Sequence, residues 1–367
     1  MKIALAGGGT GGHIVPLINV ANKIREKFPD AEFVFIGSKG KMEEEFMSRE
    51  GIPTENISVG KMRRYFAFAN FIDFFKVIAG VFHALWYLLV HMPDAIFSKG
   101  GYASFPVVLV GWLYRIPIMI HESDSVPGVT NSILSKFATR IAVSYPSAEK
   151  EFPASQVVLT GNPLQPDINQ GDAARIRAKF SLLESKRTIF VMGGSQGSRI
   201  INIKIVNILP QLLHKYQVIH QTGEKNFEEV KHKAGELGIK AGREGYHIFP
   251  FIGAELKDVF AVADLVITRA GANSLSEVAA NAKPSIVIPI ESSANNHQRM
   301  NAYALAKIGG CVVLEETNLG EHVLLNKINE IMESAELQKK LSENIKTFYH
   351  ADAAEKITEG ILGMMEK

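Results

Sequence analysis

Short runs of consecutive apolar residues alternate along the chain with longer segments in which apolar residues recur every three or four positions. Residues 2–6 form the first apolar run, residues 7–12 are mostly glycine, and residues 13–27 have helical spacing of their apolar positions. This order predicts a strand, a glycine loop and a helix at the start of the chain.

The same alternation continues to the C-terminus. Further strands are predicted at residues 32–37, 95–97, 118–120, 141–143 and 156–159, and then at 188–192, 216–220, 247–249, 265–267, 285–289 and 311–314. Nearly continuous apolar strands separated by helices are typical of parallel sheets that are covered on both faces. The pattern predicts an α/β fold.

The strand, glycine loop and helix pattern restarts at residue 188, which indicates two similar Rossmann-like domains in a chain of 367 residues. Residues 160–166 are rich in turn-forming residues and predict the boundary. We therefore expect an N-terminal domain of residues 1–164 and a C-terminal domain of residues 165–367. The last helix, about 351–367, could pack back on the N-terminal domain.

Residues 65–92 form an unusually apolar and aromatic segment. Asp73 and Lys76 interrupt it early, so the uncharged part is short for a membrane-spanning helix. A polar stripe at helical spacing comprises Asn70, Asp73, Gly80, His83 and Tyr87. This favours a helix that lies in a membrane interface, and the basic residues Lys61, Arg63 and Arg64 could meet anionic lipid headgroups. A buried helix of the first domain is the alternative, and both interpretations stay open.

Charge and cysteine content exclude several functions. Forty Lys and Arg residues against 38 Asp and Glu give a net charge of +2, too balanced for a protein whose main partner is nucleic acid. A single cysteine, Cys311, excludes a disulfide scaffold and a cysteine-based metal site. No Asp-x-Asp or paired-histidine spacing occurs. We expect no metal and no cofactor, so backbone N–H groups and helix termini would stabilise any departing diphosphate.

Three glycine-rich loops follow predicted strands, at residues 7–12, 98–104 and 193–198. Such loops place backbone N–H groups where a phosphate can bind at a helix N-terminus. Residues 268–277 add a fourth segment of small residues after a strand. A nicotinamide site would need an acid after the second strand, but Gly37, Ser38 and Lys39 stand there. No Walker lysine follows either domain-opening loop.

Taken together, the motifs resemble one family. They are Gly9-Thr10-Gly11-Gly12-His13, Ser98-Lys99-Gly100-Gly101-Tyr102, His121-Glu122, Gly161-Asn162-Pro163, Gly193-Gly194-Ser195-Gln196-Gly197, Arg269-Ala270-Gly271 with Ser276-Glu277, and His297-Gln298 with Asn301-Ala302. In this order, over nearly the whole chain, they resemble the bacterial cell-wall glycosyltransferases of family 28. The resemblance implies the GT-B fold, in which two Rossmann-like domains face each other across a central cleft.

The resemblance also implies an activity. Members move N-acetylglucosamine (GlcNAc) from UDP-GlcNAc to the C4 hydroxyl of an undecaprenyl-linked muramoyl-pentapeptide, with inversion at the anomeric carbon. The expected partners are UDP-GlcNAc, this lipid-linked acceptor and the cytoplasmic face of the cell membrane. UDP-GlcNAc is then a substrate and no cofactor is implied.

Site residues are carried over by position. His13 is the candidate catalytic base, since an imidazole suits that role near neutral pH; binding of a ligand phosphate and local packing are its alternatives. The implied donor-binding residues are Thr10, Gly11, Gly12, Asp124, Ser195, Gln196, Ile252, Ala270, Gly271, Ala272, Asn273, Ser274, Glu277, His297 and Gln298. The implied acceptor or membrane residues are Lys99, Tyr102, Asn131, Phe68, Phe75, Phe82 and Trp86. The chain departs from the family pattern at Asp124, where asparagine is usual, and at Gln165, where arginine is common.

Other functions remain open at this point. The same architecture serves transferases of other sugars or glycolipids and UDP-GlcNAc 2-epimerases, although an epimerase needs no apolar segment like residues 65–92. A nicotinamide-dependent dehydrogenase is opposed by the missing acid after the second strand. A membrane-recruited sensor of nucleotide sugars, without turnover, is a third class.

Overall fold

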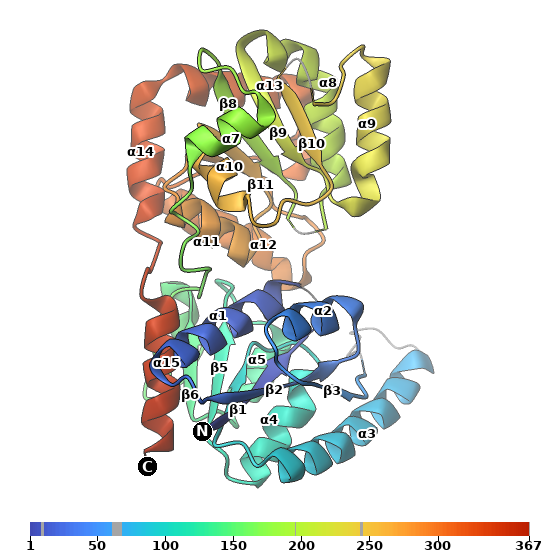
Figure 1. Ribbon diagram of the computed structural model, residues 1–367, viewed down its shortest axis with the longest axis vertical. Helices are drawn as coiled ribbons and strands as arrows, with labels where there is room; N and C mark the ends of the chain where they lie inside the picture. The colour runs from blue at the N-terminus through green and yellow to red at the C-terminus, as the bar shows by residue number, and fades with distance from the viewer. Residues whose placement is uncertain (9–10, 61–67, 195, 243–244, 367) are drawn as a thin grey trace. The chain divides into compact units, whose positions relative to one another are not determined.

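The computed structural model in Figure 1 describes residues 1–8, 11–60, 68–194, 196–242 and 245–366, leaving out the side chains of residues 42, 68–70, 72, 74 and 294. The chain forms two compact units. The N-terminal unit contains Met1–Leu164 and Ala351–Lys367, and the C-terminal unit contains Gln165–His350. Each unit is described by itself below.

A parallel sheet forms the centre of the N-terminal unit. Among the described residues its seven strands are ordered β3-β2-β1-β4-β5-β6-β7. Their bounds are β1 Lys2–Gly7, β2 Glu32–Ser38, β3 Thr54–Ile57, β4 Ala95–Ser98, β5 Ile118–Glu122, β6 Arg140–Val143 and β7 Val157–Leu159. The predicted strands are confirmed, and β3 is a strand that the pattern did not predict. The strand order reverses between β1 and β4, the position where α/β sheets bind ligands.

The helices of this unit are α1 Gly11–Lys27, α2 Lys41–Arg49, α3 Phe68–His91, α4 Ser104–Leu113, α5 Val129–Leu134, α6 Pro146–Glu149 and α15 Ala353–Met365. The C-terminal helix α15 lies beside α1 (Figure 1). Ile357 and Ile361 share a buried cluster with Leu17, and Lys23 pairs with Glu355 at 3.4 Å. These contacts attach the end of the chain to the N-terminal unit.

A second parallel sheet forms the centre of the C-terminal unit, in the order β10-β9-β8-β11-β12-β13 among the described residues. Its strands are β8 Arg187–Met192, β9 Tyr216–Gln221, β10 Tyr246–Phe249, β11 Leu265–Thr268, β12 Ser285–Val287 and β13 Val312–Val313. The helices are α7 Ala173–Phe180, α8 Arg199–Lys215, α9 Phe227–Glu236, α10 Leu256–Val262, α11 Ala272–Ala280, α12 His297–Lys307, α13 Glu321–Glu333 and α14 Ala335–Lys346. Three-residue 3-10 helices are η1 Glu224–Asn226, η2 Ala294–Asn296 and η3 Glu316–Asn318. The strand order reverses between β8 and β11, so each unit has one such switch point.

The apolar segment contains the helix α3, in whose polar stripe Asp73 and Gly80 are buried, Tyr87 is half-buried and His83 is exposed. The backbone N–H of Ser58 donates to Nδ1 of His83 at 3.3 Å, and the Tyr87 hydroxyl donates to the Asn56 carbonyl at 3.5 Å. A Cβ on Gly80 would lie 2.3 Å from the Ser58 carbonyl oxygen. Gly80, His83 and Tyr87 therefore contact β3 and the segment after it.

The opposite face of α3 is apolar and exposed. Phe82 and Trp86 are 66% and 64% exposed, and Phe71, Phe75, Leu89 and Val90 are exposed beside them. The side chain of Phe68 and residues Lys61, Arg63 and Arg64 lie outside what the structure describes. No helix within the described ranges is long and apolar enough to cross a bilayer.

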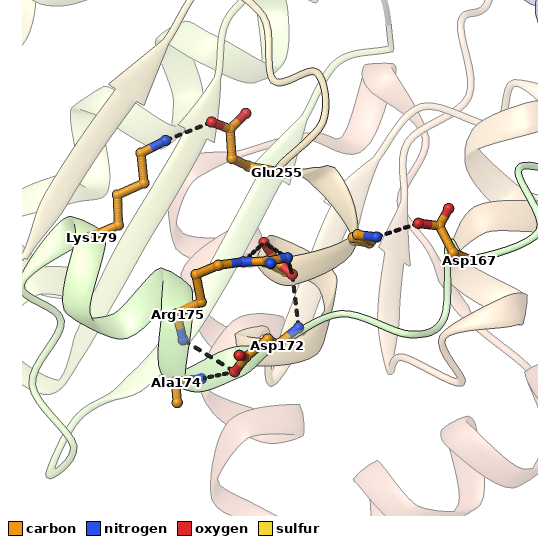
Figure 2. A network of polar contacts seen from close by, with 8 residues as sticks. Asp167, Asp172, Ala174, Arg175, Lys179 and Glu255 are labelled. Atoms are coloured by element: carbon orange, nitrogen blue, oxygen red, sulfur yellow. Dashed lines mark hydrogen bonds and ion pairs between the residues drawn. The ribbon is translucent and has the colours of Figure 1, made fainter.

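The start of the C-terminal unit is anchored by ion pairs, which Figure 2 shows. The Arg175 guanidinium donates to both carboxyl oxygens of the buried Asp258, at 2.7 and 2.6 Å. The backbone N–H of Asp172 donates to the same carboxylate at 2.7 Å, and Lys257 pairs with Asp167. This network fixes residues 167–175 to α10.

Candidate functional site

His13 lies in the first turn of α1, directly after the first glycine loop. Its Nδ1 is 2.9 Å from the Gly8 carbonyl oxygen. A carbonyl only accepts, so Nδ1 carries the proton and Nε2 keeps its lone pair. Burial lowers the pKa of His13, and the nearby positive charge of Lys99 lowers it further. The side chain is therefore a neutral imidazole with one nitrogen able to accept a proton.

Lys99 follows β4 and lies in a buried polar cluster. Its ammonium donates to Nδ1 of His121 at 2.5 Å and to Oδ1 of Asn162 at 3.4 Å. Nε2 of His121 donates to the Gly161 carbonyl at 3.0 Å, which fixes the tautomer of that imidazole. Burial lowers the pKa of Lys99 to about 7 and holds the pKa of His121 well below its usual value.

Lys99 is 2% exposed, so burial opposes a membrane contact and leaves acceptor binding as the other predicted role of this residue. His121 and Glu122 are the last two residues of β5, and both are buried. Their polar side-chain atoms bond to other groups of the protein.

Glu122 organises the loop after β5. One carboxyl oxygen accepts from the Asp124 backbone N–H at 2.9 Å, and the other accepts from the Gly128 N–H and the Asn131 side chain, both at 3.0 Å. Burial raises the pKa of Glu122, and the charge of Asp124 adds to this effect. Asp124 and Asn131 are thereby held near the end of β5. Tyr102 lies in the neighbouring loop of residues 98–104 and is half-buried.

The second glycine loop opens the C-terminal unit. Gly194 and Gly197 have φ of 80° and 74°, and a Cβ on Gly197 would lie 1.8 Å from the Thr222 carbonyl oxygen, so a larger residue cannot fit there. Ser198 caps α8 by accepting from the Ile201 N–H at 3.4 Å. Gln196 is exposed. The predicted residues Thr10 and Ser195 lie outside the described residues, as does Gly9 of the first loop.

Gln221, at the end of β9, connects this loop to Ile252, one of the implied donor-binding residues. Its amide donates to the Gly194 carbonyl at 3.3 Å, and its carbonyl oxygen accepts from the Ile252 N–H at 2.9 Å. Because the Ile252 N–H bonds to Gln221, the Ile252 carbonyl is the backbone group that could accept a hydrogen bond from a uracil. Sequence reasoning did not single out Gln221, because a lone glutamine at a strand end carries no local signal.

Helix α11 begins beside the switch point between β8 and β11. Gly271 precedes it with extended backbone angles, and Ala272, Asn273 and Ser274 form its first turn, whose N–H groups lack partners within the helix. The Ala270 carbonyl accepts from Asn301 at 3.1 Å. Such a helix start, built from small residues, suits a phosphate group.

Glu277 lies one turn further along α11 and is half-buried. Burial raises its pKa to about 8. Among the described residues, no group donates a hydrogen bond to its carboxyl. A carboxyl without a protein partner, next to an anion-binding helix start, can accept from two vicinal hydroxyls of a ribose.

Residues 290–298, named the sugar loop here, follow β12 and carry His297 and Gln298. The Gln298 side chain closes this loop because its Oε1 accepts from the Ile290 N–H at 3.2 Å. Its amide N–H groups remain for a ligand, and His297 is half-buried beside it. Within the described ranges, no group of three or more His, Cys, Asp or Glu residues is arranged to hold a metal ion.

Family models match both units of the chain. Residues 3–143 match the glycosyltransferase family 28 N-terminal domain, and residues 188–357 match the family 28 C-terminal domain. Two curated relatives are named UDP-N-acetylglucosamine--N-acetylmuramyl-(pentapeptide) pyrophosphoryl-undecaprenol N-acetylglucosamine transferase. The one from Clostridium perfringens is 39% identical over 336 residues, covering 91% of both chains. The one from Bacillus subtilis is 33% identical over 358 residues, covering 97% of this chain and 98% of the relative.

Solved structures agree on the fold. A MurG from Acinetobacter baumannii superposes with a TM-score of 0.77 at 24% identity, covering 99% of both chains. A UDP-GlcNAc 2-epimerase from Neisseria meningitidis has a TM-score of 0.71 at 11% identity, covering 99% of this chain and all of that one. Both likenesses show the two-domain GT-B fold alone, whereas the sequence matches over nearly the whole chain are specific. This chain belongs to glycosyltransferase family 28.

Proposed function

We propose that this chain catalyses the reaction for which its curated relatives are named, transferring GlcNAc from UDP-GlcNAc to a muramoyl-pentapeptide carried on undecaprenyl diphosphate. The observation that carries the proposal is the end-to-end match to those relatives, in a chain that also holds a neutral histidine after one glycine loop and an unpartnered carboxyl at an anion-binding helix start. The first group suits an acceptor hydroxyl, and the second suits a uridine diphosphate.

His13 acts as the general base. Its Nδ1–H bond to the Gly8 carbonyl aims the lone pair of Nε2 away from the backbone. Nε2 takes the proton of the C4 hydroxyl while that oxygen bonds to the anomeric carbon of GlcNAc. The bond from the anomeric carbon to the diphosphate oxygen breaks in the same step, so the configuration inverts and UDP leaves. The lowered pKa keeps His13 unprotonated at neutral pH.

The C-terminal unit holds the donor. Glu277 accepts from the ribose hydroxyls, the Ile252 carbonyl reads the uracil, and the first turn of α11 with the second glycine loop binds the diphosphate. As UDP departs, the negative charge on its diphosphate grows, and these fixed N–H groups stabilise it without rearranging. Gln298 and His297 meet the hydroxyls of GlcNAc. No metal is part of this proposal.

The exposed face of α3 binds the membrane in which the acceptor is anchored. Phe71, Phe75, Phe82 and Trp86 present aromatic side chains at helical spacing, while the helix is attached to its unit through the polar stripe. Burying two such aromatic side chains in a lipid interface contributes several kcal/mol, at about 25 cal/mol per Å². The chain thus works as a peripheral protein at the cytoplasmic face of the cell membrane.

A transfer assay tests this proposal. Purified protein is incubated with radiolabelled UDP-GlcNAc and a short-chain lipid-linked muramoyl-pentapeptide, with UDP-glucose and UDP-GalNAc in parallel reactions. We expect a labelled disaccharide-lipid with UDP-GlcNAc and much less with the other donors. Binding of UDP-GlcNAc without any labelled lipid would exclude this acceptor, and conversion of UDP-GlcNAc to a C2 epimer would establish an epimerase instead.

A further inference from the structure

Arg269 lies between two segments of the C-terminal unit that the proposed function assigns to the donor. One is the loop after β11 that leads into helix α11, and the other is the sugar loop, residues 290–298. Arg269 directly precedes Ala270 and is only 6% exposed. One end of its guanidinium, Nη1, donates to the Ile288 carbonyl at 3.1 Å. The other, Nη2, donates to Oε1 of Glu316 at 2.5 Å. A single side chain thus connects the loop after β11 to the end of β12 and to η3.

Glu316 extends this connection into the sugar loop. Its second carboxyl oxygen accepts from the Glu291 backbone N–H at 3.4 Å. Glu291 returns the contact, because its own carboxyl accepts from the Thr317 N–H at 2.9 Å. The first turn of the sugar loop is therefore bound to η3 from both sides, and η3 is bound to Arg269.

The sugar loop itself is held in an unfavourable conformation. Asn295 and Asn296 are consecutive residues with φ of 54°, in the left-handed region. Such residues persist only where the surroundings fix them, at a cost of about 1 kcal/mol or more each. Gln298 closes the loop against Ile290, and the contacts to Glu316 hold its start. The position of His297 and Gln298 depends on these attachments.

We infer that the Arg269–Glu316 ion pair positions the sugar loop relative to the loop between β11 and α11, which binds the nucleotide in the proposed function. In this way the pair sets the selectivity for the donor's sugar without contacting that sugar. Arg269 and Glu316 are positioning residues in this scheme. The inference rests on the proposed function, because it assumes that residues 290–298 face the sugar of UDP-GlcNAc.

The chemistry of the pair suits this role. A planar guanidinium can bond to a carbonyl and a carboxylate in two fixed directions, which a lysine ammonium on a flexible stem does not reproduce. Both side chains are largely buried, so water screens their attraction weakly. A shift of η3 together with the sugar loop bound to it would separate the two charges, and that separation is costly in a buried setting.

Selective binding measurements test the inference. The variants are Arg269→Lys and Glu316→Gln at the buried pair, and Glu291→Ala at the exposed end of the same connection. Glu315→Gln is the matched control, since it removes the charge of the neighbouring Arg299–Glu315 pair, 3.0 Å long, which joins α12 to the residue before η3. Calorimetry gives the Kd for UDP and for UDP-GlcNAc, and transfer assays give kcat/KM for UDP-GlcNAc and UDP-GalNAc.

The buried variants should bind UDP within about twofold of the wild type and bind UDP-GlcNAc about tenfold more weakly, with a matching loss of preference over UDP-GalNAc. Glu291→Ala should show the same pattern at about threefold, and it keeps the test valid should thermal unfolding show that a buried variant does not fold. Glu315→Gln should behave like the wild type.

Two results would overturn the inference. Equal losses for UDP and UDP-GlcNAc would mean that Arg269 acts on the nucleotide directly, for which its Nε is the remaining donor, since nothing among the described residues accepts from it. Unchanged selectivity in all three variants would mean that the pair only stabilises the fold. A wild-type protein that fails to bind UDP-GlcNAc would refute the proposed function itself, before any variant is compared.

Discussion

Donor binding should depend on pH through Glu277. Its pKa is raised to about 8 by burial in the ligand-free chain, whereas two ribose hydroxyls bind most strongly to the ionised carboxylate, which accepts at both oxygens. The nucleotide therefore binds the deprotonated form, and binding releases a proton. A group with this raised pKa is ionised to about one part in ten at pH 7, so affinity must increase as the pH rises.

The size of the effect follows from the same value. The apparent Kd equals the Kd of the ionised form multiplied by one plus the ratio of neutral to ionised carboxyl. Between pH 6.5 and pH 8.5, that factor falls about 25-fold for a pKa of about 8. This change corresponds to about 2 kcal/mol of binding free energy. UDP-GlcNAc is the right probe because its diphosphate diester does not titrate in this range.

Calorimetric titration at five pH values measures the profile. The wild type should gain affinity with pH and level off above pH 8, and it should release nearly one proton per nucleotide at pH 7. Glu277→Gln should bind with a flat profile, weaker than the wild type above pH 8. Glu228→Gln changes an exposed acid in the first turn of α9 and is the control. A flat wild-type profile, or an unchanged slope in Glu277→Gln, would refute the assignment of Glu277 to the ribose.

Four further predictions concern the base, its neighbour, the unit anchor and the membrane face. His13→Ala should lower kcat by about 100- to 10,000-fold in the transfer assay and leave the Kd for UDP-GlcNAc unchanged; a large change in Kd alone would contradict the base assignment. Lys99→Met removes a charge that lowers the pKa of His13, so the acidic limb of the kcat/KM profile should move to higher pH, and an unmoved limb would refute the coupling. Asp258→Ala leaves the Asp172 N–H unpaired and should cost about 2–4 kcal/mol in chemical denaturation, whereas a loss below ~0.5 kcal/mol would show that the anchor is unimportant. Phe82→Asp with Trp86→Asp should abolish sedimentation with anionic vesicles and keep activity on a water-soluble acceptor; retained sedimentation would place the membrane contact elsewhere.

The sequence predicted most of the sheet because buried parallel strands are nearly continuous apolar runs. It missed β3, whose residues Thr54, Glu55 and Asn56 are polar and only partly buried at a sheet edge. The polar residues His121 and Glu122 obscured the end of β5, since hydrogen bonds inside the unit compensate their burial. Apolar periodicity indicates which residues are buried against other apolar groups. It does not indicate β3 or the end of β5, because their polar residues are placed by hydrogen bonds.

The direction of α3 also escaped the pattern. The pattern left a membrane-interface helix and a buried helix both open, whereas in the structure Ser58 and Asn56 bond to His83 and Tyr87 and the aromatic side is exposed. Helical spacing shows which residues share a face and does not show which face is covered. That information comes from a segment more than twenty residues away in the chain.

The candidate site shows the same division. Glycine loops, Glu277 and His13 have local signatures because they depend on chain reversals and helix starts. Gln221 and Glu316 have none, because each acts by bonding to residues far away in the chain, such as Ile252 and Arg269. The predicted roles of His297 and Gln298 remain predictions until a ligand is bound.

Single-turnover transfer tests the central claim most directly. Enzyme in excess is mixed with radiolabelled UDP-GlcNAc and the short-chain lipid-linked muramoyl-pentapeptide, quenched over time, and the product's anomeric configuration is read by NMR. The proposed direct displacement predicts one β-linked disaccharide-lipid per donor in the wild type, and a much slower rate in His13→Ala. An α-linked product, or free sugar and UDP without labelled lipid, would contradict it.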